Sequence, residues 1–262
     1  MRLYGRNPVL ERIKSNPRSI TKIYIQAGHP ESSYVQQKSK QFNIPVTVIP
    51  GSKMLKLARD VNSQGLLAEV EGFSYIQYTD MLDMAKEKNM ILVFLDELND
   101  PQNLGGIIRS LGCFGHFCIV LPTHHSVEVT ETVLRVACGG DNYVIVAKVA
   151  NLSNAIVKAK DEGFWIAGSS VEGGESLTDV KFQFPLGIVI GSEQKGIRDV
   201  IRKHIDIAVT IPMANARMSF NAAHATTILC YEISRHRKTT KPVRTSKPIG
   251  YKYEEEPEPE ES

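Results

Sequence analysis

The chain has 262 residues, of which 42% are hydrophobic and 23% are charged, and its formal net charge is +2. This composition is typical of a globular protein with one large domain or two modest ones, and the net charge alone does not indicate a dedicated nucleic-acid binder. No run approaches the roughly 20 apolar residues of a membrane span, the first residues lack the apolar core of a secretory signal, and the cysteines lack disulfide or zinc-ligand spacing. We therefore expect a cytoplasmic protein with no membrane segment and no metal.

The first 71 residues alternate short helical and extended patterns. The predicted elements are a helix at 8–13, a strand at 22–26, a helix at 32–41, a strand at 46–49, a helix at 53–59 and a strand at 66–70. Together they predict a small α/β module over 1–71. The periodicity then breaks at Gly72 and a polar helical stretch follows at 79–88, so we place a linker at 72–89.

From residue 90 to 237 apolar strands alternate with amphipathic helices. The predicted strands are 91–95, 117–121, 144–146, 164–167, 187–190 and 205–211, and the predicted helices are 104–114, 129–138, 152–160, 197–203 and 220–232. Short, almost wholly apolar strands indicate a mostly parallel sheet covered on both faces, hence an α/β fold. Ligands of such sheets bind beyond the carboxyl ends of the strands. The tail at 238–262 is rich in proline and charge, and we predict that it is disordered.

The first polar cluster runs from Asn99 to Arg109, after the strand at 91–95 and into a helix. Asn103 is predicted to cap that helix, Gly105 permits close backbone approach, and Arg109 lies about one and a half turns further on. Taken alone, the cluster fits a capped helix with a surface arginine equally well.

The second cluster, from Gly191 to Gly196, follows the strand at 187–190 and is close to a phosphate-binding loop. However, Ile197 and Arg198 stand where that loop requires lysine followed by serine or threonine. The chain also has no G-x-G-x-x-G sequence. A nucleoside triphosphate site and a dinucleotide site are therefore not predicted.

The third cluster begins at Ile211, crosses a polar loop and enters the last helix with Ser219-Phe220-Asn221. Ser219 or Asn221 alone would be explained as a helix cap. Ser169 follows the strand at 164–167 and could border the same site. His124 and His125 are adjacent and cannot both face one ion from a helix or strand, so no role is assigned to them.

In this order and on these loops, the three clusters resemble the motifs of the SpoU (TrmH-like) family of SPOUT RNA 2′-O-ribose methyltransferases. The matching residues are Asn103, Gly105 and Arg109; Gly191, Glu193 and Gly196; and Ile211-Pro212-Met213 with Ser219-Phe220-Asn221-Ala222-Ala223. The resemblance extends from Tyr4 to about Arg237. Gln194, Phe220 and Ala222 depart mildly from the residues common in the family.

The resemblance implies a C-terminal SPOUT domain with a deep trefoil knot, and a homodimer whose active sites use residues of both subunits. It also implies that residues 1–71 form an L30e/L7Ae-like RNA-binding domain. S-adenosylmethionine would be the methyl donor, and no metal would be needed. By the same resemblance, the catalytic residues are Asn103, Arg109, Glu193, Ser219 and Asn221, and the cofactor-binding residues are Gly191, Ile211, Met213 and Phe220.

The branch most similar to this chain methylates a guanosine of large-subunit ribosomal RNA. Two alternatives remain open at this point: a tRNA 2′-O-methyltransferase, and a ribosome-associated RNA-binding protein without catalysis. Structured RNA is the expected partner in every case. We expect residues 1–71 to guide the RNA, because basic residues cluster near the start of the module. These residues are Arg2, Arg6, Arg12, Lys14, Arg18 and Lys22.

Overall fold

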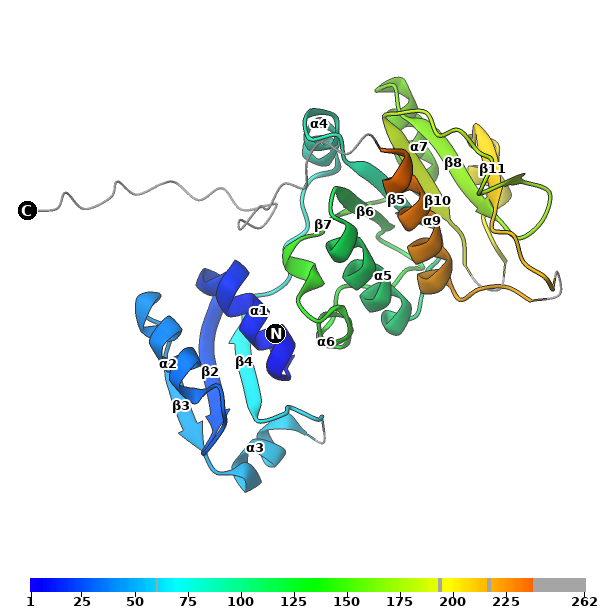
Figure 1. Cartoon of the computed structure of the whole chain (residues 1–262). Helices are drawn as coiled ribbons and strands as arrows, with labels where there is room; N and C mark the ends of the chain where they lie inside the picture. The colour runs from blue at the N-terminus through cyan, green and yellow to red at the C-terminus, as the bar shows by residue number, and fades with distance from the viewer. Residues whose placement is uncertain (60, 193–194, 216–217, 238–262) are drawn as a thin grey trace, which may run out of the picture.

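The computed structural model describes residues 1–59, 61–192, 195–215 and 218–237. These residues form two sheets, a small one near the N-terminus and a larger one after it (Figure 1). The tail at 238–262, for which disorder is predicted, lies outside the described residues. None of the described helices is long and apolar enough to cross a membrane.

The small sheet has the strand order β1-β4-β2-β3, with only β2 and β3 parallel. Its elements are β1 (Arg2–Tyr4), α1 (Arg6–Ser15), the short turn η1 (Pro17–Ser19), β2 (Ile20–Gln26), α2 (Ser32–Gln41), β3 (Val46–Ile49), α3 (Gly51–Ala58) and β4 (Leu66–Val70). The predicted strands at 22–26, 46–49 and 66–70 are confirmed. β1 was not expected, because three residues are too few to show a periodicity.

The large sheet has the order β7-β6-β5-β10-β8-β11-β9, and every strand pair in it is parallel. Its strands are β5 (Ile91–Leu95), β6 (Phe117–Pro122), β7 (Ile145–Val149), β8 (Trp165–Ser170), β9 (Glu175–Ser176), β10 (Leu186–Ile190) and β11 (Ile207–Thr210). All residues of β5, β6 and β10 are buried. A parallel sheet covered on both faces explains that burial, and the predicted α/β fold is confirmed.

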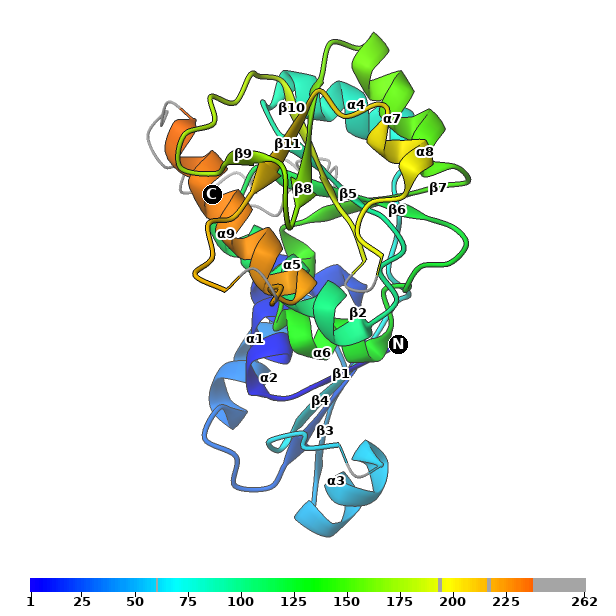
Figure 2. The same cartoon turned by 90° about the vertical axis from the view of Figure 1, so that its right-hand side faces the viewer.

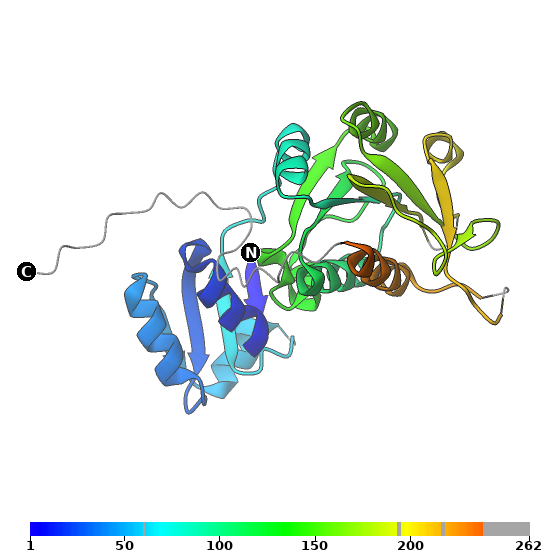
Figure 3. The ribbon, with the colours of Figure 1, turned by 45° about the horizontal axis from the view of Figure 1, so that its top comes forward.

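Helices cover both faces of the large sheet. They are α4 (Tyr78–Glu87), α5 (Pro101–Phe114), α6 (Glu131–Ala137), the turn η2 (Gly140–Asn142), α7 (Leu152–Asp161), α8 (Asp199–Arg202) and α9 (Ala222–His236). Figure 3 shows α4 and α7 on one face and α5 and α9 on the other. The alternation along β5 explains this, because Val93 packs in one apolar cluster with α5 whereas Phe94 packs in another with α4 and α7.

The segment for which a linker is predicted, 72–89, contains the whole of α4. Met81, Leu82 and Ala85 of this helix are buried in the apolar cluster on one face of the large sheet. Ile76 also forms a bridge to Ala147 of β7. These residues therefore contribute to the core of the large sheet and do more than connect the two parts.

The small module lies against α6 of the larger part (Figure 2) and also contacts η2 through Asp141. The Arg2 backbone N–H donates to the Glu131 carboxylate at 2.8 Å. Arg12 forms a buried ion pair with Asp141 and donates to Ser19 Oγ at 2.9 Å. One apolar cluster is continuous across the contact and contains residues of α1, β4, α5 and α6. The two parts are thus joined by a packed and charged interface.

Candidate functional site

A cavity of about 450 Å³ opens beyond the carboxyl ends of β8, β10 and β11. This is where an open parallel sheet is expected to bind its ligand. Its lining residues come from the ends of those strands, from the segments that follow them, and from α8 and α9: Ser169, Ser170, Val171, Glu172, Ile190, Gly191, Ser192, Lys195, Gly196, Ile197, Arg202, Val209, Ile211, Met213, Ser219, Phe220, Ala222 and Ala225. The second and third motifs therefore meet at one cavity.

The second motif folds tightly back on itself. Ser192 and Gly196 exchange backbone hydrogen bonds of 3.2 and 2.9 Å. A Cβ atom at Gly191 would lie 2.2 Å from the carbonyl carbon of Gly196 and 2.4 Å from the backbone nitrogen of Ile197. Only glycine fits here, because the two ends of the loop touch. Glu193, a predicted catalytic residue of this motif, lies outside the described residues.

The third motif supplies an apolar wall and a hydroxyl. Ile211 and Met213 are partly buried, Ser219 is exposed, and Phe220 keeps 42% of its surface accessible. All four line the cavity. An exposed aromatic ring at the rim of a cavity suits a flat ligand, because burial of the ring would contribute to binding.

Asn221 and Asn103 join the third motif to the first. The Asn221 side chain caps α9, since its Oδ1 accepts from the backbone N–H groups of Ala223 at 2.9 Å and His224 at 3.3 Å. Its Nδ2 donates to Asn103 Oδ1. Asn221 is therefore a helix cap, as the simpler interpretation of the sequence had it, and it also holds the buried Asn103.

The prediction that Asn103 caps α5 is wrong. The helix begins two residues earlier, at Pro101, and its N-cap is Asp100, whose carboxylate accepts from the Gln102 backbone N–H at 2.8 Å. Proline fits the first helical position because its nitrogen has no hydrogen to satisfy. Asn103 is thereby placed inside the first turn, where it is buried and reaches Asn221.

Arg109 lies on a different side of α5 from Asn103. Six residues correspond to about 240° around an α-helix, and Arg109 is exposed while Asn103 is buried. Arg109 is not among the described residues that line the cavity. Asn103 is therefore hydrogen-bonded to Asn221, which directly follows the cavity residue Phe220. Arg109, the arginine of the same motif, lies apart from both.

The glycines of the first motif serve helix packing. A Cβ at Gly105 would lie 2.5 Å from Val136 Cβ of α6, and one at Gly106 would lie 3.2 Å from Ala223 Cβ of α9. Thr227 of α9 donates to Ser110 of α5 at 2.8 Å. The close backbone approach predicted at Gly105 is thus an approach of neighbouring helices, and α5 fits closely between α6 and α9.

Several cavity residues belong to no motif. Ser169 and Ser170 are the last two residues of β8, which is longer than the strand predicted at 164–167. The position of Ser169 after that predicted strand was the signal that it could border the site. Glu172 and Arg202 also line the cavity, and Arg202 donates to the Ile197 carbonyl at 3.1 Å. Neither has a sequence signal beyond its distance from a strand end. Within the described part of the chain, no group of three or more His, Cys, Asp or Glu residues could hold a metal ion.

Comparisons with known proteins agree with this geometry. Residues 90–231 match the model of the SpoU rRNA Methylase family, and residues 2–76 match that for RNA 2′-O ribose methyltransferase substrate binding. An uncharacterized tRNA/rRNA methyltransferase of Synechocystis is 34% identical over 92% of this chain, which spans only 64% of that relative. A putative TrmH family tRNA/rRNA methyltransferase of Bacillus subtilis is 32% identical over 89% of this chain and 94% of its own length.

The fold is also that of solved methyltransferases. The AdoMet-bound rRNA methyltransferase from Sinorhizobium meliloti superimposes with a TM-score of 0.74 at 20% identity, over 91% of this chain and 88% of that chain. The family match covers more than half of the chain, and it includes the loops that build the cavity. The chain therefore belongs to the SpoU family of RNA methyltransferases.

Proposed function

We propose that this enzyme transfers the methyl group of S-adenosylmethionine to a ribose 2′-hydroxyl of structured RNA, and that its target is a guanosine of large-subunit ribosomal RNA. The observation that carries the proposal is the meeting of the second and third motifs at one cavity, with Asn103 of the first motif tied to Asn221 beside it. A target in tRNA is the second candidate, because the Synechocystis and Bacillus relatives are named for tRNA and rRNA together.

The cavity fits S-adenosylmethionine. Its volume of about 450 Å³ is within the range of small-ligand sites. Ile211, Met213 and Phe220 offer apolar and aromatic surface for the adenine ring, and Gly191 lines the cavity with backbone alone, since it has no side chain. These four residues would hold the cofactor, and hydroxyls such as that of Ser169 offer polar partners.

When bound, S-adenosylmethionine supplies a methyl group that is already activated by its sulfonium. The remaining task is to align the ribose oxygen and to remove its proton during attack. We assign Arg109 to stabilise the developing negative charge on that oxygen, because a guanidinium resists deprotonation and cannot serve as the base. The proton would leave through phosphate or water. Asn103, Glu193, Ser219 and Asn221 would orient the ribose and Arg109.

A homodimer would explain why Arg109 is not at the cavity of its own chain. The resemblance to the family implies active sites that use both subunits, and an exposed arginine on α5 is available to a second copy. Sedimentation at assay concentration tests this assembly. An active monomer would contradict the assignment of Arg109 to a shared site.

The module at 1–71 is proposed to guide the RNA, with one change to the set of basic residues. Arg12 is buried against Asp141 and is not available to phosphate. Lys14 and Arg18 are exposed and fit the role. Replacing both by Glu in the full chain should weaken RNA binding and reduce its salt dependence, while the affinity for S-adenosylmethionine is unchanged.

Calorimetric titration with S-adenosylmethionine is the direct test of the proposed function. A saturable one-site isotherm supports an enzyme, whereas no binding favours an RNA-binding protein without catalysis. Mapping of 2′-O-methyl groups in RNA from a deletion strain then identifies the target. Loss of one mark in large-subunit rRNA supports the proposal, and loss of a mark in tRNA alone replaces it with the second candidate.

A further inference from the structure

We infer that Asp96, a residue outside all three motifs, is a positioning residue that closes the cofactor loop and fixes that loop to the base of α5. The loop spans 191–197, of which 193 and 194 lie outside the described residues; its described residues Gly191, Ser192, Lys195, Gly196 and Ile197 all line the cavity. The inference rests on the proposed use of this cavity for S-adenosylmethionine. Asp96 itself is not among the described residues that line the cavity, so it acts through the loop.

Asp96 contacts the chain on both sides of the loop. Its backbone N–H donates to the carbonyl of Ile190, the residue before the loop, at 2.8 Å. Its carboxylate accepts from Arg198, the residue after the loop, at the backbone N–H (3.0 Å) and at Nε (2.8 Å). One residue therefore holds both ends of the loop together, and the contact between Gly191 and Gly196 follows from that closure.

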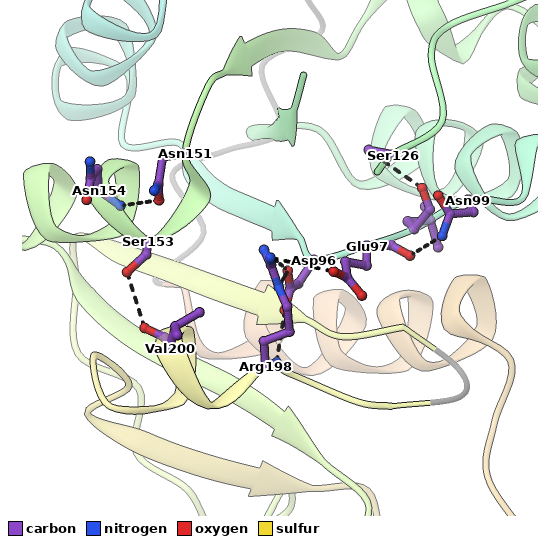
Figure 4. A network of polar contacts seen from close by, with 10 residues as sticks. Asp96, Glu97, Asn99, Ser126, Asn151, Ser153, Asn154, Arg198 and Val200 are labelled. Carbon is purple, nitrogen blue, oxygen red and sulfur yellow. Dashed lines mark hydrogen bonds and ion pairs between the residues drawn. The ribbon is translucent and has the colours of Figure 1, made fainter. Parts of the chain in front are cut away.

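The charge of the carboxylate is essential to this arrangement. Asp96 is fully buried, and its Oδ1 also pairs with Arg198 Nη2 at 2.7 Å. Arg198 further reaches Glu97 at 3.5 Å, as Figure 4 shows. The hydrogen bond to Asp96 raises the pKa of the Arg198 guanidinium. Charge-assisted bonds of this kind are short and strong, and a buried carboxylate that lost them would be costly.

Asp96 is also the first residue of the segment that connects β5 to α5. It directly follows β5, and four residues later Asp100 caps the helix that carries Asn103 and Arg109. A shift of Asp96 would therefore move the loop that lines the cavity and the entry of the helix that bears the motif arginine. The pair Asp96–Arg198 therefore joins the loop that lines the cavity to the segment that leads into α5.

The variant Asp96→Asn tests the inference with little change in shape. An amide replaces one carboxylate oxygen by an N–H donor, which must then face an N–H of Arg198. The dissociation constant for S-adenosylmethionine, measured by calorimetry on the full chain, should rise about tenfold or more. In cofactor-free protein, backbone hydrogen exchange at 195–198 should become faster, which is a readout independent of activity.

Asp206→Asn is the matched control. Asp206 is also a carboxylate of the large sheet, it accepts from the Ile166 backbone N–H at 2.8 Å and it pairs with Lys160. It directly precedes β11 and so lies at the amino ends of the strands, whereas the cavity lies beyond their carboxyl ends. This variant should lower the melting temperature without changing cofactor affinity or exchange at 195–198. Equal losses of affinity in both variants would make Asp96 a general stabilising residue and overturn the inference.

Arg198→Lys keeps the test decisive if Asp96→Asn does not fold. The Arg198 side chain is 37% exposed, and lysine keeps the charge and the backbone N–H while losing the forked contact. A loss of affinity of about threefold to tenfold supports the inference. Affinity within twofold of the wild type, in a variant that folds, overturns it. Failure of the wild-type chain to bind S-adenosylmethionine would refute the proposed function instead, so the two outcomes are distinguishable.

Discussion

Two buried carboxylates of the large part of the chain, Asp96 and Asp141, differ in what they join. Asp96 connects segments of the large sheet and pairs with Arg198, which is partly open to solvent. Asp141 of η2 connects the large part of the chain to the small module through Arg12, and both of these side chains are almost fully buried. Water can reach Arg198 and solvate a charge that loses its partner in the first pair, whereas the second pair is closed to water. Loss of one partner should therefore destabilise the fold far more in the second pair than in the first.

The polar groups around the two carboxylates differ in the same way. Each oxygen of Asp96 accepts from Arg198. Around Asp141, Arg12 Nε and Asn142 Oδ1 have no hydrogen-bond partner among the described residues. Burial raises the pKa of the Asp141 carboxyl, and Arg12 offsets only part of this effect. The junction between the two parts is therefore the region whose buried polar groups are less well satisfied.

The largest expected effect is that of Arg12→Met. It leaves Asp141 buried without its cation and should lower the free energy of unfolding by about 3 to 5 kcal/mol. Chemical denaturation of the full chain measures this value. The double variant with Asp141→Leu should recover much of the loss, because it removes the buried charge as well. If the double variant were as unstable as Arg12→Met, packing at the junction would explain the effect better than charge.

The same variant has a defined pH dependence. Because burial raises the pKa of Asp141 in the folded protein, folding favours its protonated form. A carboxyl with a raised folded pKa loses stability as pH rises from its unfolded value through its folded one. Without Arg12 the folded pKa should rise further, so Arg12→Met should be less destabilised at pH 5 than at pH 8. An equal loss at both pH values would contradict a charge at the junction.

Arg109→Ala tests the motif arginine of α5. It should lower the rate of methyl transfer by about 100- to 1000-fold, the usual effect of removing one group that stabilises a developing oxyanion. Cofactor affinity should stay within about twofold, since an unchanged binding step corresponds to less than ~0.5 kcal/mol. Lys158→Ala, which removes an exposed cation from α7, is the control. Normal turnover in Arg109→Ala would remove this arginine from the mechanism.

Gly191→Val tests the cavity side. The new side chain would overlap the backbone of Gly196 and Ile197 and force the loop apart. We expect a loss of S-adenosylmethionine affinity of about 100-fold, or ~2.7 kcal/mol. Gly72→Val is the control, because a Cβ at Gly72 meets nothing within 4 Å. Tight cofactor binding by Gly191→Val would mean that the closed loop is not needed for the site.

Asn221→Ala should have the smallest effect. Loss of the cap costs about 1 kcal/mol, which lowers the melting temperature by roughly 2 to 4 °C in a protein of this size. Asn151 caps α7 through the Asn154 backbone N–H at 3.1 Å, so Asn151→Ala is a matched control. Both variants should lose similar stability, and only Asn221→Ala should also slow methyl transfer, through its contact with Asn103. Equal turnover in the two would make Asn221 a cap alone.

The sequence predicted the alternating strands and helices well, because their signals are local. The strands at 91–95 and 46–49 were located without error, and the second and third motifs were correctly predicted to follow strands of the large sheet. The cap of α5 was misassigned to Asn103. Asp100, which is followed by Pro101, is an equally good capping signal and is the actual cap. The two-residue β9 is too short for any periodic signal to reveal it.

The two ion pairs illustrate what the sequence could not provide. Arg198 and Asp96 are 102 residues apart in the chain, and Arg12 and Asp141 are 129 apart. No periodicity links residues at such distances, and Arg12 read from the sequence alone resembled any other cation of a basic cluster. Its burial depends on how the small module packs on η2, which is a property of the tertiary fold.

The turn at η2 has a consequence for which nucleotide is modified. A Cβ at Gly139 would lie 2.6 Å from Glu11 Cβ of α1, and one at Gly140 would lie 3.0 Å from the Cα atom of Arg109, so the turn touches the small module and the motif helix at once. If the small module holds the RNA, as we propose, this contact makes the protein a molecular ruler. The methylated ribose would lie at a fixed distance from the part of the RNA that the small module holds. Inserting base pairs between the two should therefore move methylation to a different nucleotide at the same distance, whatever the sequence around that nucleotide.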